Sequence, residues 1–75
     1  VEDRFDIVIA NINRNILIND MAAFRKCMAD DGELFVSGFY EGDVRMIEEA
    51  AACCGLHLRD VVTDEDWACV MFALA

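Results

Sequence analysis

The chain has 75 residues, 57% of them apolar, and 15 acidic against 6 basic residues give a formal net charge of -9. This length allows one domain at most, and such a short chain buries only ~60–65% of its unfolded surface. An acidic surface repels phosphate backbones, so we expect no direct binding of nucleic acid. No apolar run approaches the ~20 residues that span a bilayer, and we expect no membrane segment.

The cysteines give no sign of a metal site. The chain has 4 cysteines, and none of them form a C-x-x-C pair. Zinc needs ligand spacings that do not occur here, and reduced thiols in a cytoplasmic protein are the expected state. The acidic run at residues 64–66 is interpreted as a solvated loop, because consecutive acids seldom converge on one ion. We therefore expect no bound metal.

Residues 5–11 predict a strand that ends on an amide. The segment reads FDIVIAN and is apolar on both faces, which is typical of a parallel strand covered by helices on each side. Asn11 then stands at the carboxyl end of the strand, the edge at which open α/β sheets bind ligands. Its amide can both donate and accept hydrogen bonds. The residues alone favour the simpler interpretation, in which Asn11 belongs to a turn or helix cap.

Two helices are predicted between the later strands. The first begins at Asn13 or Asn15, since either can act as an N-cap, and is expected to end at Gly32. Its apolar side chains recur at helical spacing, at Leu17, Met21, Phe24 and Met28. The second helix opens at residues 41–43, where acidic side chains favour the positive end of the helix dipole, and Gly55 is its expected C-cap.

Three further strands are predicted, at residues 33–39, 56–63 and 67–74, with Gly38 ending the first of them. A short loop joins the last two, so they pair antiparallel. The last strand is apolar on both faces and needs neighbours on both edges, which places it beside strand 33–39. The expected order is therefore first, second, fourth, third, with only the fourth antiparallel. The fold class is α/β.

Three segments together resemble a known family. They read DIVIANINRNIL from residue 6, DGELFVSGF from residue 31 and DWACV from residue 66. In this order and spacing they are similar to the bacterial ribosomal protein L-eleven methyltransferases, which are class I S-adenosylmethionine-dependent enzymes. The resemblance covers essentially the whole chain. It implies the C-terminal half of a Rossmann-like catalytic domain, with four strands (three parallel, the last antiparallel) and two main helices.

The resemblance also implies an activity and a site. The family transfers methyl groups from S-adenosylmethionine to amino groups (lysine side chains and the N-terminal amine) of a large-subunit ribosomal protein in the cytoplasm. It implies that Asn11 contacts the cofactor beside the reaction centre, and that Ile12 and Asn13 border the incoming amine. Ser37 and Gly38 are candidates for the floor of the substrate pocket, although a tight turn explains them equally well. No side chain is expected to act as a catalytic acid or base.

Residues 1–75 are expected to form a single partial domain. The Gly-rich turn and the acidic residue that hold such a cofactor would belong to an absent first half, so these residues alone should be inactive and bind S-adenosylmethionine weakly or not at all. The edge of strand 5–11 is apolar and unprotected, so we expect the fragment to self-associate. The competing interpretation is a non-catalytic methyltransferase-like module for binding or assembly. A flavodoxin-like enzyme is disfavoured by the antiparallel last strand.

Overall fold

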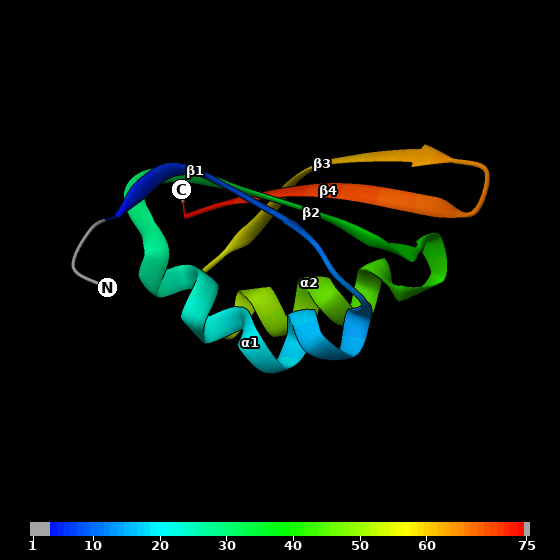
Figure 1. The fold of residues 1–75 in the computed structure, drawn as a ribbon, viewed down its shortest axis with the longest axis horizontal. Coiled ribbons are helices and arrows are strands. Elements are labelled where there is room, and N and C mark those ends of the chain that lie inside the picture. The colour runs from blue at the N-terminus through cyan, green and yellow to red at the C-terminus, as the bar shows by residue number, and fades with distance from the viewer. Residues whose placement is uncertain (1–3, 75) are drawn as a thin grey trace.

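The computed structural model describes residues 4–74, which form one four-stranded sheet and two α-helices (Figure 1). The strand order is β1-β2-β4-β3, as predicted. The elements in chain order are β1 (Phe5–Asn11), α1 (Arg14–Cys27), β2 (Met28–Tyr40), the 3-10 turn η1 (Glu41–Asp43), α2 (Val44–Ala52), β3 (His57–Asp64) and β4 (Trp67–Ala73).

The expectation of three parallel strands needs correction. Within the described sheet only β1 and β2 pair in parallel. Strand β4 lies between β2 and β3 and pairs antiparallel with both, so β3 has no parallel neighbour. The cause is the short connection between β3 and β4, because a tight hairpin can join only antiparallel neighbours.

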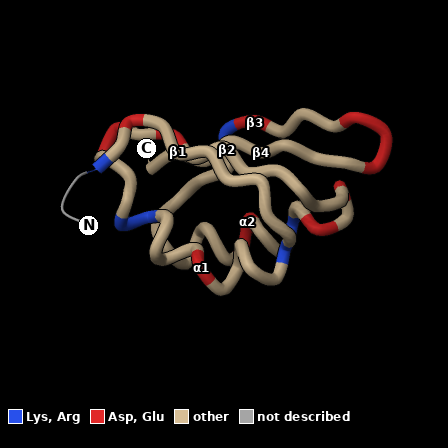
Figure 2. Tube along the Cα trace, viewed as in Figure 1, with Lys and Arg blue, Asp and Glu red and all other residues tan. Residues whose placement is uncertain are grey.

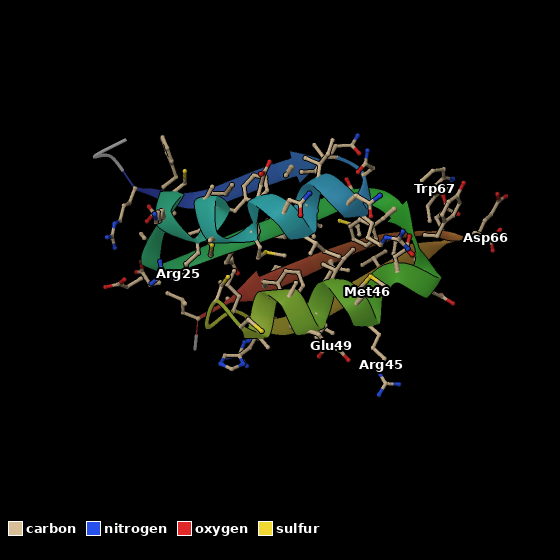
Figure 3. The ribbon with its side chains drawn as sticks, turned by 90° about the horizontal axis from the view of Figure 1, so that it is seen from below. Arg25, Arg45, Met46, Glu49, Asp66 and Trp67 are labelled. Carbon is tan, nitrogen blue, oxygen red and sulfur yellow. The ribbon has the colours of Figure 1, made fainter. Side chains whose placement is uncertain are left out.

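Both helices lie on the same face of the sheet, side by side (Figure 3). The crossovers from β1 to β2 and from β2 to β3 advance in the same direction along the sheet, and right-handed crossovers then place α1 and α2 on one side. The core forms between these layers and includes Leu17, Met21, Leu34, Ile47, Val70 and Phe72, each at most 1% exposed.

The opposite face of β1 is bare in the part of the chain that the structure describes, contrary to the expected cover on both sides. Val8 and Ala10 pack toward the helices. Phe5, Ile7 and Ile9 point the other way and are 51%, 56% and 76% exposed. The alternation of the strand was therefore predicted correctly, but the described residues cover only one of its two apolar faces.

Two of the three cap positions predicted for the helices agree with the structure. Asn13 caps α1, since its Oδ1 accepts a hydrogen bond of 3.0 Å from the Ile16 N–H. Gly55, with a φ of 82°, terminates α2 in the left-handed region. The predicted cap at Gly32 is wrong, because α1 ends at Cys27 and β2 already begins at Met28. Gly32 lies within β2, where a Cβ would be 3.0 Å from the Phe5 carbonyl oxygen.

Candidate functional site

The carboxyl ends of β1 and β2 lie next to each other and bring the candidate residues together. Asn11 is aligned with Ser37 at the end of the parallel ladder. One residue further on, the Ile12 N–H donates a hydrogen bond of 3.0 Å to the Ser37 carbonyl oxygen. The loop that leaves β1 is thus attached to β2 immediately beyond Asn11.

Gly38 forms a bulge in β2 at this point instead of ending the strand. The register with β4 shifts between Ser37 and Phe39, and the strand continues to Tyr40. The φ of Gly38 is 98°, which L side chains rarely adopt. A Cβ at this position would also lie only 2.6 Å from the Asn11 Oδ1. Glycine is therefore required by conformation and by space, since the Asn11 side chain rests against the bulge.

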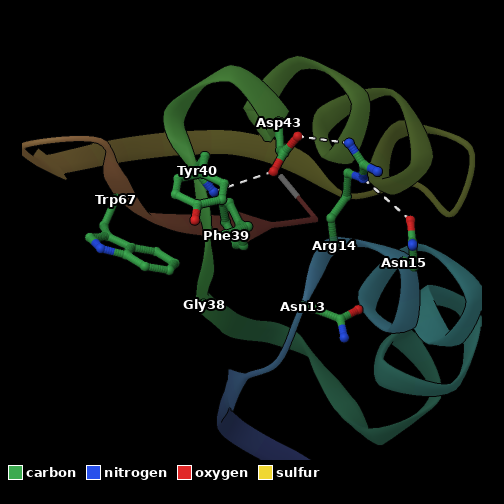
Figure 4. Close-up of a pocket in the computed structure, with 8 residues that line it drawn as sticks. All are labelled: Asn13, Arg14, Asn15, Gly38, Phe39, Tyr40, Asp43 and Trp67. Atoms are coloured by element: carbon green, nitrogen blue, oxygen red, sulfur yellow. Dashed lines mark hydrogen bonds and ion pairs between the residues drawn. The ribbon is translucent and has the colours of Figure 1, made fainter.

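Two open hollows flank the bulge. The first, called the Asn11 hollow, has a volume of about 490 Å³ and is lined by Asn11, Ser37, Gly38, Val62, Asp64, Trp67, Ala68 and Cys69. The second, called the Arg14 hollow and drawn in Figure 4, has a volume of about 330 Å³ and is lined by Asn13, Arg14, Asn15, Gly38, Phe39, Tyr40, Asp43 and Trp67. Gly38 and Trp67 line both hollows and so separate them.

The structure places the five candidate residues differently. Asn11, Ser37 and Gly38 line the Asn11 hollow. Asn13 lines the Arg14 hollow, although its side-chain oxygen is engaged in capping α1. Ile12 lines neither hollow: its side chain packs against the hydrophobic core, and its carbonyl oxygen would lie 2.8 Å from a Cβ at Gly38.

An aromatic pair that the sequence did not assign to the site borders the hollows, with Tyr40 lining the Arg14 hollow and Trp67 lining both. The rings of Tyr40 and Trp67 stack with centroids 4.7 Å apart and an interplanar angle of 21°. Trp67 is 51% exposed and therefore forms a partly open wall of both hollows. The two residues are directly opposite in the register of β2 with β4, but the predicted strand ended at residue 39 and left Tyr40 outside this pairing.

An ion pair closes the far side of the Arg14 hollow. Arg14 Nη1 lies 2.9 Å from Asp43 Oδ1 (Figure 4). The other carboxylate oxygen, Asp43 Oδ2, accepts a hydrogen bond of 3.3 Å from the Tyr40 N–H. The sequence carried no signal for this pair, since its members are 29 residues apart on different elements.

Negative charge gathers around this end of the molecule. Acidic residues occupy the turn between β3 and β4 and the η1 segment (Figure 2). Asp64, at the end of β3, lines the Asn11 hollow itself. Within residues 4–74 no group of three or more His, Cys, Asp or Glu side chains is arranged to hold a metal ion. No helix among these residues is long and apolar enough to cross a membrane.

Comparison with known proteins identifies the family. Residues 1–74 match the family described as ribosomal protein L11 methyltransferase (PrmA). The chain belongs to this family. A PrmA relative named ribosomal protein L11 methyltransferase from Bacteroides fragilis is 49% identical over 70 residues, and one of the same name from Porphyromonas gingivalis is 44% identical over 68 residues. These matches cover 93% and 91% of this chain, which spans about a quarter of each relative, 25% and 23%.

Solved structures support the PrmA fold. The crystal structure of ribosomal protein L11 methylase from Lactobacillus delbrueckii subsp. bulgaricus superposes with a TM-score of 0.89 at 23% identity, over 97% of this chain and 38% of that one. The M1.HpyAVI–SAM complex superposes with a TM-score of 0.73 at 11% identity, over 92% and 43% of the two chains. At these identities the likeness concerns the fold alone.

Proposed function

We propose that the full-length protein transfers methyl groups from S-adenosylmethionine to amino groups of ribosomal protein L11 in the cytoplasm, the acceptors being lysine side chains and the N-terminal amine. Membership of the PrmA family supports the reaction class. The observation that carries the proposal is the amide of Asn11, held at the carboxyl edge of the sheet beside the Gly38 bulge in an open hollow. This edge is where open α/β sheets bind ligands.

These residues fit one wall of a cofactor site. Asn11 is exposed at the end of β1, and its amide has both donors and acceptors for a ligand. The cofactor supplies an electrophilic methyl group on a positively charged sulfur. This chain spans about a quarter of the relatives it matches, and we assign the contacts that hold the adenosine to other parts of the longer protein. Asn11 would then border the cofactor beside the transferred methyl group.

The acceptor nitrogen needs orientation more than acid–base assistance. A neutral amine attacks through its lone pair, forming the nitrogen–carbon bond as the carbon–sulfur bond breaks and then losing a proton to water. Asn11 Oδ1 and the Ile12 carbonyl oxygen both lie directly beside Gly38. In this position the two oxygens can accept hydrogen bonds from the amine N–H groups. Asn13, Ser37 and Gly38 would border the substrate. Such alignment alone supplies a large part of a rate enhancement.

Replacement of Asn11 by alanine in the full-length protein tests this assignment. Losing a well-placed polar contact should cost about 2–4 kcal/mol of transition-state stabilisation, by analogy with removed oxyanion-hole donors. We expect kcat/KM for methylation of purified ribosomal protein L11 to fall accordingly, with an unchanged circular dichroism spectrum. Asn19→Ala, an exposed position on α1, is the matched control and should keep full activity.

Two results would contradict the proposal. If Asn11→Ala turns over and binds S-adenosylmethionine like the unaltered protein, Asn11 is only a turn residue. If the unaltered full-length protein binds ribosomal protein L11 but transfers no methyl group, the non-catalytic binding module is the better description.

A further inference from the structure

One carboxylate connects the two loops that border the candidate site. Arg14 is the first residue of α1 and directly follows the segment 11–13. Asp43 is the last residue of η1, and η1 directly follows the segment 38–40. Asp43 accepts from the Arg14 guanidinium at 2.9 Å and from the Tyr40 N–H at 3.3 Å (Figure 4). Through Asp43, the loop that leaves β1 is bonded to the loop that leaves β2.

This ion pair differs from the others in the described part of the chain. Its side chains are 38% and 20% exposed, whereas each of the remaining pairs has at least one member that is 73% exposed or more. It is also the shortest, at 2.9 Å against 3.6–3.8 Å. Partly buried pairs are screened less by water and salt than exposed pairs, so this one can hold a geometry that surface pairs cannot.

We propose that Arg14 and Asp43 are positioning residues for methyl transfer, an inference that rests on the proposed function. Their pair holds the Asn11–Asn13 segment against the Gly38 bulge and keeps Tyr40 stacked on Trp67. Because Gly38 and Trp67 line both hollows, a shift of either loop changes both hollows together. Arg14 and Asp43 act through these neighbours and do not touch the reacting atoms.

Arginine variants of the full-length protein separate positioning from general stability. We expect Arg14→Met to lower kcat for methylation of ribosomal protein L11 by about tenfold, since small misplacements of reacting groups cost this much or more. Arg14→Lys should stay within about threefold, because an ammonium group can still donate to Asp43. The control is Arg45→Met, which removes a 90% exposed arginine from α2 with only a 3.8 Å contact to Glu49 (Figure 3) and should leave kcat unchanged.

Hydrogen exchange gives a second readout that does not depend on methyl transfer. The amides of Ile12 and Tyr40 should exchange about tenfold faster in Arg14→Met but not in Arg45→Met, because their hydrogen bonds lie on the two bonded loops. If Arg14→Met fails to fold, Asp43→Asn weakens the pair with Arg14 but keeps an acceptor for the Tyr40 N–H, and it should show the same loss of kcat and the same faster exchange at Ile12.

Unchanged exchange and unchanged kcat in these variants overturn the inference, as does an equal loss of kcat in Arg14→Lys and Arg14→Met. Faster exchange in Arg14→Met, combined with no methyl transfer by the unaltered protein, would instead retain the bridge between the loops and reject the proposed function. The two proposals therefore fail on different measurements.

Discussion

Gly38 shows how a single residue shapes this site. Its positive φ creates the bulge that lets β2 continue to Tyr40, and the space that its missing Cβ leaves is occupied by the Asn11 amide. The glycine therefore determines both the direction of β2 beyond Ser37 and the position of Asn11. A substituent here disturbs the backbone and the candidate cofactor contact together.

Replacement of Gly38 by alanine should destabilise the full-length protein by about 1–3 kcal/mol, the typical cost of a residue held in a sparsely populated backbone region. We expect methyl transfer to fall as well, because the new Cβ would displace Asn11 Oδ1. Urea unfolding followed by circular dichroism measures the stability. Gly42→Ala is the control, since a Cβ there meets nothing within 4 Å and should change stability by no more than about 0.5 kcal/mol. Equal midpoints for the two variants would show that the bulge is not strained.

At the scale of elements, α1 connects the candidate site to the core. Its N-terminus follows Asn11 after two residues, and its apolar side packs on the sheet through Leu17 and Met21. The cap at Asn13 determines where the helix begins, and Arg14 in the first turn pairs with Asp43. The start of α1 is therefore part of the site as well as part of the fold.

Removal of this cap should have a measurable cost. Asn13→Ala leaves the Ile16 N–H without its side-chain acceptor, and we expect a loss of about 1 kcal/mol in the free energy of unfolding. Asn19→Ala, in the middle of α1 and exposed, should be neutral or slightly stabilising because alanine has the higher helix propensity. Thermal unfolding of both variants measures the difference. A cap role is excluded if the two midpoints coincide.

At the scale of the whole molecule, the uncovered face of the sheet is the most unusual feature. β1 is an edge strand in the described sheet, and Phe5, Ile7 and Ile9 expose apolar surface beside that open edge. Such an edge presents unpaired backbone groups together with apolar side chains, which favours pairing with another chain. In the full-length protein we expect other segments to cover this face.

The 75 residues by themselves should therefore self-associate at micromolar concentration, as measured by analytical ultracentrifugation. Ile9→Lys should shift the population toward monomer, because it places a charge on the apolar face beside the open edge. The control is Ile16→Lys, which changes an isoleucine that is 46% exposed on α1 and not part of β1. A strictly monomeric unaltered chain would contradict the prediction, and so would an equal effect of the two lysine variants.

The sequence by itself determined the order of the elements and the strand order, limited the cap of α1 to Asn13 or Asn15, and identified the family through the resemblance of three segments. The elements and their order follow from local patterns: alternation within strands, helical spacing, cap residues and a short loop that forces an antiparallel hairpin. Only the tertiary structure decided that a single face is covered, that Gly38 is a bulge, that Tyr40 stacks on Trp67 and that Arg14 pairs with Asp43. Each of these depends on contacts between elements distant in the chain, which no local pattern encodes. The local pattern placed Asn11 at the end of its strand. Only the packed sheet showed that its side chain lies against Gly38, because that contact joins two strands.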